Sequence, residues 1–147
     1  MTAYADTGFL CSLYAPDAHT PLAAARMKRQ NLPLPVTWLH QLEIRNALRL
    51  RVFRNEIAVE QEAASTNAFL ADLAAGVLCH AEPQLADLTR EAERLSARHS
   101  TVLGTRSLDI LHVASAVVLG LHDFLTFDRR QRELARAAGL HLQVLGE

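Results

Sequence analysis

The sequence predicts an α/β protein, a three-layer α/β/α sandwich of about five short parallel strands flanked by helices. Short apolar segments alternate with longer segments of helical periodicity along the whole chain, a rhythm typical of parallel sheets covered on both faces. Half of the 147 residues are hydrophobic, which is enough for a substantial core. Long linkers, low-complexity tracts and internal repeats are missing from the sequence, so we expect residues 1–147 to form one domain.

The first elements are marked by an apolar run and by helix-start residues. Residues 2–5, TAYA, predict a short strand, and a helical pattern follows through Tyr14. Thr20 before Pro21 is a favourable pair for an N-cap and a first helical position, which predicts a helix over 22–30.

Prolines limit the second strand, and a long periodic segment follows it. Pro33 and Pro35 restrict the strand to the last residues of 32–37. Residues 38–54 then have helical periodicity. The apolar positions that we expect to face the core are Leu39, Leu42, Ala47 and Leu50.

The middle of the chain repeats the helix–strand–helix order. Residues 59–75 predict a helix that Gly76 ends. The segment VLCHAE is strand-like, and a helix is expected over about 83–99.

The last third contains two helices and two strands. We expect a buried helix over 107–119, ended near Gly120 and packed by Leu108, Leu111, Val113 and Val117. The segment DFLTF predicts the fourth strand, Asp128 would cap a charged helix that ends at Gly139, and HLQVL predicts the fifth strand.

Composition excludes several classes of protein. A net charge of −1 argues against a globally basic nucleic-acid binder. The sequence has no apolar run near the ~18 residues that a membrane span needs, and MTAYADTGFL lacks the basic start of a signal peptide. Cys11 and Cys79 lie in apolar contexts without metal-ligand spacing, which favours buried thiols and a cytoplasmic location.

Four acidic residues stand where an active site of a parallel α/β protein would form. Asp6 and Asp128 follow the first and fourth strands, and Glu43 and Asp109 lie early in helices. Sites in such folds form beyond the carboxyl ends of strands. Each acid also has an ordinary explanation, as a helix cap, a partner of the helix dipole or a solvated helix residue.

Taken together, the four acids favour a metal site. Glu43 and Asp109 are flanked by apolar neighbours, so the carboxylates would lie on half-buried faces. Carboxylates that share a site repel one another unless a cation neutralises them. Oxygen ligands without a Cys or His cluster suit Mg²⁺ or Mn²⁺.

The segments DTGFL, LEIRNAL, RSLDILHVASA and LTFD, in this order and at these separations, resemble the PIN-domain family, and in particular its VapC-type toxins. The resemblance extends over essentially the whole chain. It implies that Asp6, Glu43, Asp109 and Asp128 are catalytic residues that bind one or two Mg²⁺ or Mn²⁺ ions. It implies a metal-dependent endoribonuclease, the toxin of a toxin–antitoxin pair, which cleaves RNA phosphodiester bonds by a metal-activated water.

The resemblance also implies supporting residues and partners. The candidate neighbours of the metal or contacts of the substrate are Thr7, Asn46, Thr126, His112 and Arg129. Gly8 departs from the Ser or Asn of many members. His112 is expected either to touch the substrate or Asp109, or to be a packed structural histidine. A homodimer and a cognate antitoxin are the expected protein partners, with Trp38, Phe53 and Phe69 as candidate contacts or core residues.

RNA would need cationic groups around an acidic pocket. If four of the 16 acids serve the site, the 15 Lys and Arg outnumber the remaining acids by three. The candidates for binding phosphates follow Glu43 and Asp128 in the sequence, and they are Arg45, Arg49, Arg51, Arg54, Arg129, Arg130 and Arg132.

Two other functions are compatible with parts of the pattern. The alternative hypothesis is a binding module that works mainly through complex formation or operator binding with an antitoxin, without significant nuclease activity. A receiver-like phosphoacceptor domain would need an acidic pair after its first strand, where Asp6 stands alone, and an Asp after its third, where the sequence has His80 and Glu82. The sequence therefore argues against it.

Overall fold

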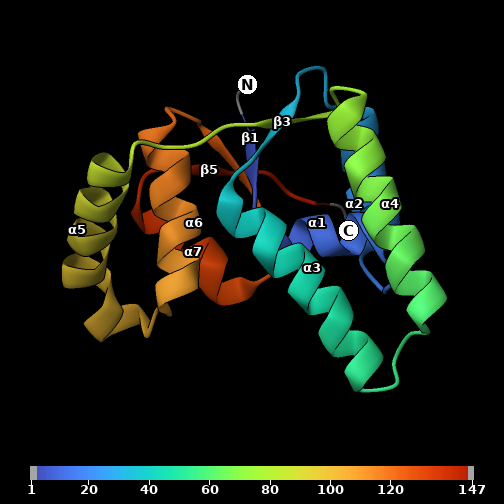
Figure 1. The fold of residues 1–147 in the computed structure, drawn as a ribbon. Coiled ribbons are helices and arrows are strands. Elements are labelled where there is room, and N and C mark those ends of the chain that lie inside the picture. Colours follow the sequence, from blue (N-terminus) through green and yellow to red (C-terminus); the bar gives the residue numbers. More distant parts are fainter. Residues whose placement is uncertain (1–2, 146–147) are drawn as a thin grey trace.

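The computed structural model describes residues 3–145 as short strands and longer helices in alternation (Figure 1). The strands are β1 (Ala3–Ala5), β2 (Leu34–Val36), β3 (Leu78–His80), β4 (Asp123–Leu125) and β5 (His141–Leu142). The helices are α1 (Thr7–Tyr14), α2 (Thr20–Lys28), α3 (Trp38–Phe53), α4 (Val59–Ala74), α5 (Leu85–Leu103), α6 (Ser107–Val118) and α7 (Arg129–Ala137). The predicted α/β class is confirmed.

All strand pairs are parallel, as predicted, but the hydrogen-bonded ladder is in two parts. One part has the order β1-β4-β5 and the other pairs β2 with β3. In the first part Ala5 is opposite Leu125, so the residues that follow β1 and β4 leave the sheet side by side. This pairing brings Asp6 and Thr126 together at the carboxyl edge.

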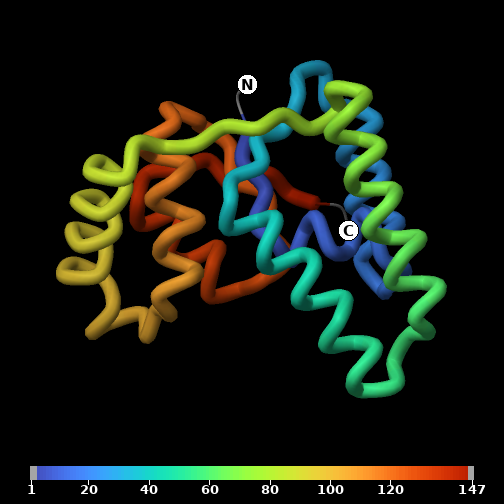
Figure 2. Tube along the Cα trace, in the orientation of Figure 1, coloured from blue at the N-terminus to red at the C-terminus, as the bar shows by residue number. Residues whose placement is uncertain are grey.

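The helices form two layers on either side of the β1-β4-β5 sheet. The alternation of side chains along β1 explains the division, since Ala3 and Ala5 face one core and Tyr4 faces the other. The first core lies among α1 to α4 and the second among α5 to α7. Figures 1 and 2 show the pair α5 and α6 at one end of the molecule and α4 at the other.

The N-cap of α2 lies one residue before the predicted one, and the helix begins two residues before the predicted range. The N-cap is His19, without a side-chain capping bond, and Thr20 is the first helical residue. The Thr20 hydroxyl donates instead to the Ser12 carbonyl at 2.6 Å. A tertiary contact with the end of α1 therefore takes the hydroxyl that the local pattern assigned to capping.

The buried face of α3 is also different from the one predicted. Leu39 is buried as expected, but the other core positions are Ile44 and Leu48, together with the polar His40. Of the predicted core positions, Ala47 is only partly buried, and Leu42 and Leu50 are 58% and 40% exposed. The predicted and the observed sets of core positions both have helical spacing. Because the buried face carries a histidine, its sequence pattern is typical of a solvent-facing side.

Several large apolar side chains therefore face solvent. On α3 these are Trp38, Leu42, Leu50 and Phe53, with Phe53 82% exposed. Leu108 on α6 is 48% exposed, so the expectation that it packs into the domain is wrong. Phe69, by contrast, is fully buried in the core among α1 to α4.

Between residues 3 and 145, every helix is too short or too polar to cross a membrane.

Candidate functional site

Asp6 ends β1 and caps α1. Its Oδ1 accepts the Phe9 amide at 2.8 Å, which is the bond of an N-cap residue. Its Oδ2 accepts the Thr126 hydroxyl, and its own amide donates to the Leu125 carbonyl at 3.1 Å. These bonds fix the carboxylate at the carboxyl ends of the two paired strands.

Asp128 has the same role at the next helix. Its Oδ1 accepts the Gln131 amide at 2.9 Å as the N-cap of α7. The Asp128 amide donates to Thr126 Oγ1 at 3.0 Å. The Thr126 hydroxyl thus accepts from one acid's backbone and donates to the other's side chain, so it holds the two acids in a fixed relation.

The protonation of Asp6 reflects its burial. Burial raises the pKa of Asp6 to about 6, against the hydrogen bonds from Thr126 and the Phe9 amide, which lower it. Asp128 raises this pKa further by its charge. A nearby cation would offset both effects and favour the ionised carboxylate.

Glu43 extends from α3 and is held by His112 of α6 and Thr7 of α1. Glu43 Oε1 lies 2.5 Å from His112 Nε2 and accepts the Thr7 hydroxyl at 2.9 Å. Burial alone would raise the pKa of Glu43, but the bonds from His112 and Thr7 outweigh it and hold that pKa below its usual value. Glu43 is therefore an ionised carboxylate in a defined orientation.

A buried tyrosine orients His112 from behind. Tyr4 Oη lies 2.8 Å from His112 Nδ1, and burial raises the pKa of this phenol far above its ordinary value. Because ionised Glu43 can only accept, the imidazole proton that faces it is on Nε2, and in the neutral imidazole Nδ1 then accepts the Tyr4 hydroxyl. The chain Tyr4–His112–Glu43 spans β1, α6 and α3.

His40 fastens α3 to the end of β1. Its Nε2 donates to the Ala5 carbonyl at 2.7 Å, and its Nδ1 accepts the Thr37 amide at 3.0 Å. Burial lowers the pKa of His40 to about 3, with a further lowering by His112. Because Ala5 precedes Asp6 and His40 lies one turn before Glu43, this neutral histidine fixes the two acids relative to each other.

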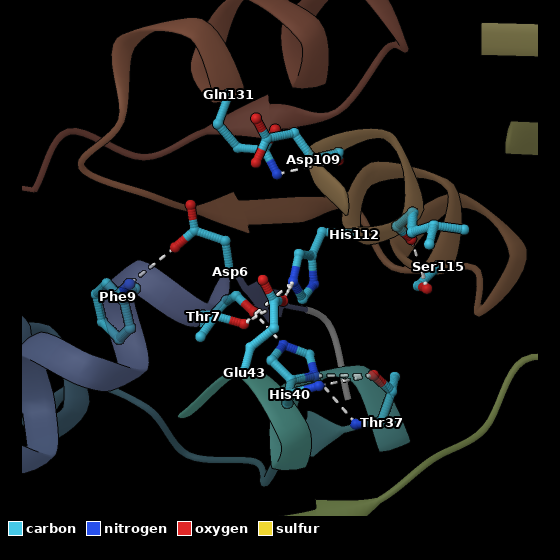
Figure 3. Close-up of polar contacts among 12 residues, drawn as sticks. Asp6, Thr7, Phe9, Thr37, His40, Glu43, Asp109, His112, Ser115 and Gln131 are labelled. Carbon is cyan, nitrogen blue, oxygen red and sulfur yellow. Dashed lines mark hydrogen bonds and ion pairs between the residues drawn. The ribbon is translucent and has the colours of Figure 1, made fainter. Parts of the chain in front are cut away.

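Asp109 lies in the first turn of α6 and pairs with an arginine of its own segment. Arg106 Nε lies 3.1 Å from Asp109 Oδ2. The Gln131 side-chain amide donates to the Asp109 carbonyl at 3.1 Å, which ties α6 to the capped end of α7. Figure 3 shows Asp109 and Gln131 on one side of the site and Glu43, Thr7 and His40 on the other, with His112 between them.

One cavity of about 160 Å³ joins these groups. It is lined by Asp6, Thr7, Gly8, Glu43, Arg106, Asp109, His112 and Asp128. All four candidate acids therefore reach a common space from four distant segments. A Cβ added to Gly8 would lie 3.5 Å from Asp6 Oδ1, so a side chain here would be in ordinary contact with the acid.

The other candidate residues have different surroundings. Thr7, Thr126 and His112 bond directly to the acids, as described above. Asn46 is exposed on α3, and among the described residues it does not line this cavity. Arg129 is exposed and borders a neighbouring hollow with Phe127.

Sequence reasoning did not identify Tyr4, His40, Arg106 or Gln131. Arg106 precedes Asp109 by three residues, which is a spacing that pairs side chains on one helical face and was available as a signal. His40 stands three residues after Thr37, where a capping box has Glu or Gln. The contacts of Tyr4 and Gln131 are long-range, and local sequence carries no sign of them.

The donor set suits a hard divalent cation, although the carboxylates are not gathered into a cage. Across residues 3–145, no three His, Cys, Asp or Glu side chains are close enough to hold one ion. Mg²⁺ needs no such cage, because it is usually bound by one or two carboxylates, several waters and substrate phosphates. The bonds described above engage Asp109 Oδ2, Asp128 Oδ1 and Glu43 Oε1, and the other oxygen of each carboxylate takes no part in them.

Comparison with known proteins gives a fold and no sequence relative. No protein-family model and no curated protein sequence matches the chain. Among solved structures it is similar to VapC20 of Mycobacterium tuberculosis, described as a sarcin-ricin loop cleaving toxin. The identity is 19%, the TM-score is 0.71, and the match covers 95% of this chain and 97% of that one.

A second similar structure is FitAcB from Neisseria gonorrhoeae, with 14% identity and a TM-score of 0.67 over 98% of both chains. The chain therefore has the PIN-like fold of VapC20 over nearly its whole length, as the sequence predicted.

Proposed function

We propose that this protein is a Mg²⁺- or Mn²⁺-dependent endoribonuclease and acts as the toxin of a toxin–antitoxin pair. The observation that carries the proposal is the shared cavity, which Asp6, Glu43, Asp109 and Asp128 line from four separate segments. The likeness in fold to an RNA-cleaving toxin supports it. The proposed assignment of these four acids as metal-binding and catalytic residues rests on the same geometry.

When bound, the metal would supply an activated water and stabilise the charge that develops on the phosphate and the leaving oxygen. Asp6, Asp109 and Glu43 are the proposed principal ligands or water-positioning groups, and Asp128 completes the set. His112 and Thr7 keep Glu43 ionised and aimed, and Thr126 holds Asp6 next to Asp128. These fixed orientations are what a preorganised metal centre requires.

Arg106 gives the acidic cavity one cation of its own. It lines the cavity and pairs with Asp109 through Nε, while most of its side chain remains exposed. An exposed ion pair of this kind is weak, about 0–1 kcal/mol. Arg106 is therefore available to contact a substrate phosphate once a metal engages Asp109.

The antitoxin is proposed to bind the exposed apolar stripe of α3. Trp38, Leu42, Leu50 and Phe53 are all at least 40% exposed, and several large apolar side chains exposed on one helix are a candidate interaction surface. Arg45 and Arg49 on the same helix, and Arg54 at its C-cap, would favour an acidic partner. The expected homodimer remains part of the proposal.

The nuclease proposal is tested by the substitution Asp109→Asn, assayed on structured RNA with Mg²⁺, with Mn²⁺ and with excess EDTA. The wild-type protein should cleave with either metal and lose activity in EDTA. Asp109→Asn should reduce the rate by at least about 100-fold, since even groups outside the ligand set affect metal sites by 10–100-fold. Asp87→Asn is the matched control, because Asp87 pairs with Arg90 at the same spacing on exposed α5.

Two results would contradict the nuclease proposal. Cleavage that persists in EDTA would rule out the metal requirement, and full activity in Asp109→Asn would rule out the site. If expression arrests growth equally with Asp109→Asn and wild type, the alternative of a binding module without significant nuclease activity is favoured. The exposed stripe on α3 is the observation that supports this alternative.

A further inference from the structure

A second cavity adjoins the acidic one, across Asp6 and Asp128. It measures about 250 Å³ and is lined by Asp6, Gly8, Ser12, His19, Phe127 and Asp128. Asp6, Gly8 and Asp128 line both cavities, so the two lie next to each other. A strand bound at the acids therefore has this second cavity beside it.

Two residues that line this cavity, His19 and Phe127, belong to a ladder of aromatic rings that continues into the core at Phe9. Phe9 and Phe127 stack with ring centroids 5.5 Å apart and planes 14° apart. His19 stacks on Phe127 at 4.3 Å and 5°. Phe9 is fully buried, Phe127 is partly buried and His19 is exposed, so the ladder leads from the core to the surface.

The position of His19 is fixed rather than left to a mobile loop. The His19 amide donates to Asp17 Oδ1 at 2.8 Å, and Ser12 donates to Asp17 Oδ2 at 2.8 Å. The loop between α1 and α2 is thereby tied to the cavity wall. A ring held in advance loses little conformational freedom when another flat ring stacks on it.

A third hollow continues past Phe127 and is cationic. It measures about 500 Å³ and is lined by Phe127, Arg129, Arg132, Glu133 and Arg136. Spacings of three and four residues bring these arginines to one face of α7. Glu133 pairs with Arg129 at 3.6 Å, which leaves Arg132 and Arg136 as the surplus of positive charge.

The charges of the second cavity and of the third hollow favour different parts of a nucleotide. Asp6 and Asp128 on one wall of the second cavity, with Asp17 behind Ser12, disfavour a phosphate there. A neutral base is compatible with these acids and with the rings. The arginines of α7 suit the phosphates of the same strand.

From these observations we propose that the cavity at His19 and Phe127 is a nucleobase subsite for single-stranded RNA. A base adjacent to the cut phosphate contacts the His19 ring and the edge of Phe127, and the backbone continues over Arg132 and Arg136. Recognition of splayed bases by Phe and His rings is common in proteins that bind single strands. The subsite rests on the proposed nuclease function, since a metal held by the acids beside it would bind the reacting phosphate.

The subsite is tested by binding, in the Asp109→Asn background with Mg²⁺, so that the probe stays intact. The probes are a fluorescent ten-nucleotide oligoadenylate RNA and a ten-unit ribose-phosphate chain without bases. His19→Ala should weaken binding of oligoadenylate roughly five- to tenfold and leave the abasic chain unchanged. His122→Ala is the control, since His122 is an exposed histidine that precedes β4, at the opposite edge of the sheet.

The arginines should behave in the opposite way. Arg136→Ala should weaken both probes equally and lower the slope of log affinity against log salt by about 0.7, the value for one phosphate contact on a single strand. Arg90→Ala on α5 is the matched control. Phe127→Leu, which keeps an apolar side chain in the core, should reduce the preference for oligoadenylate in the same direction as His19→Ala.

The outcomes separate this subsite from the nuclease proposal. If His19→Ala affects neither probe, or affects both equally, the subsite is refuted even when wild-type protein cleaves RNA. If base-dependent binding is found but the wild type never cleaves RNA, the subsite stands and the nuclease proposal fails. If neither probe binds, the subsite is refuted.

Discussion

His40 offers a direct test of how the site is held together. It is fully buried, and as a neutral ring it donates to Ala5 and accepts from Thr37. A proton on Nδ1 would replace the accepted hydrogen bond by a contact between two donors. We predict that protonation of His40 drives local or global unfolding. The free energy of unfolding should therefore fall as the pH decreases, over a range in which exposed histidines change it little.

The magnitude follows from the two pKa values. Burial lowers the pKa of His40 from 6.5 to about 3 in the folded protein. Between these values the unfolded chain binds the proton and the folded chain does not, so stability is fully present above pH 6.5 and falls as the pH decreases. Each pH unit inside this window corresponds to 1.36 kcal/mol, which gives a loss of about 2 kcal/mol between pH 7 and pH 5.

His40→Gln isolates this contribution from that of other groups. Gln at this position retains the acceptor of a capping box with Thr37 and does not titrate. Asp6, with its raised pKa, changes stability in the opposite direction over the same range, but it does so in both proteins. The difference between wild type and His40→Gln should therefore decrease by about 2 kcal/mol from pH 7 to pH 5.

Urea unfolding followed by circular dichroism at pH 7, 6 and 5 measures this difference. His122→Gln, at an exposed position, is the control and should show a pH-independent difference. A difference between wild type and His40→Gln that stays constant over this range would refute the reasoning, because it would mean that His40 accepts a proton in the folded state. An increase with decreasing pH would refute it equally.

Two further predictions concern the buried chain behind Glu43 and the aromatic residues of the helices. Tyr4→Phe leaves His112 Nδ1 buried without a donor, so it should lower the free energy of unfolding by about 1–3 kcal/mol and slow cleavage about 10-fold or more, as loss of a supporting hydrogen bond at a metal site does. Phe69→Ala should lower the free energy of unfolding by about 3–5 kcal/mol, whereas Phe53→Ala, at a residue that is 82% exposed, should change it by less than about 0.5 kcal/mol and should instead weaken binding of the antitoxin. Urea titration and a rate assay check the prediction for Tyr4→Phe. Urea titration, with calorimetry of the purified complex, checks the two Phe variants. An equal loss of stability in both Phe variants would contradict the assigned burial.

The helices and strands could be predicted because glycines and helix-capping residues mark their ends in the sequence. Gly76 and Gly120 adopt positive φ at helix ends, and such residues are recognisable in the sequence. The faces of the helices were harder. The buried side of α3 carries His40, whose hydrogen bonds are to a carbonyl 35 residues earlier, and periodicity alone carries no information about such a partner.

That Asp6 and Asp128 would lie close together could be predicted for a related reason. Asp6 and Asp128 follow strands whose carboxyl ends meet at one edge, so the topology alone brings them together. Tyr4 and His112 are 108 residues apart, and their contact depends on the packing of α6 against β1. In an apolar strand such as AYA, the local sequence does not show whether the tyrosine hydroxyl forms a hydrogen bond or the side chain is simply packed in the core.

In the sequence, helix capping and a place in the acidic site look like alternative roles for Asp6 and Asp128. The structure shows that the two positions coincide. Each carboxylate caps a helix with one oxygen and also lines the acidic cavity. Each carboxylate therefore has one oxygen at the positive end of a helix dipole. Because Asn is as good an N-cap as Asp, replacing either residue by Asn removes the charge and keeps the cap. Loss of cleavage in a well-folded Asn variant would therefore be attributable to the site, whereas an Ala variant would change the helix as well.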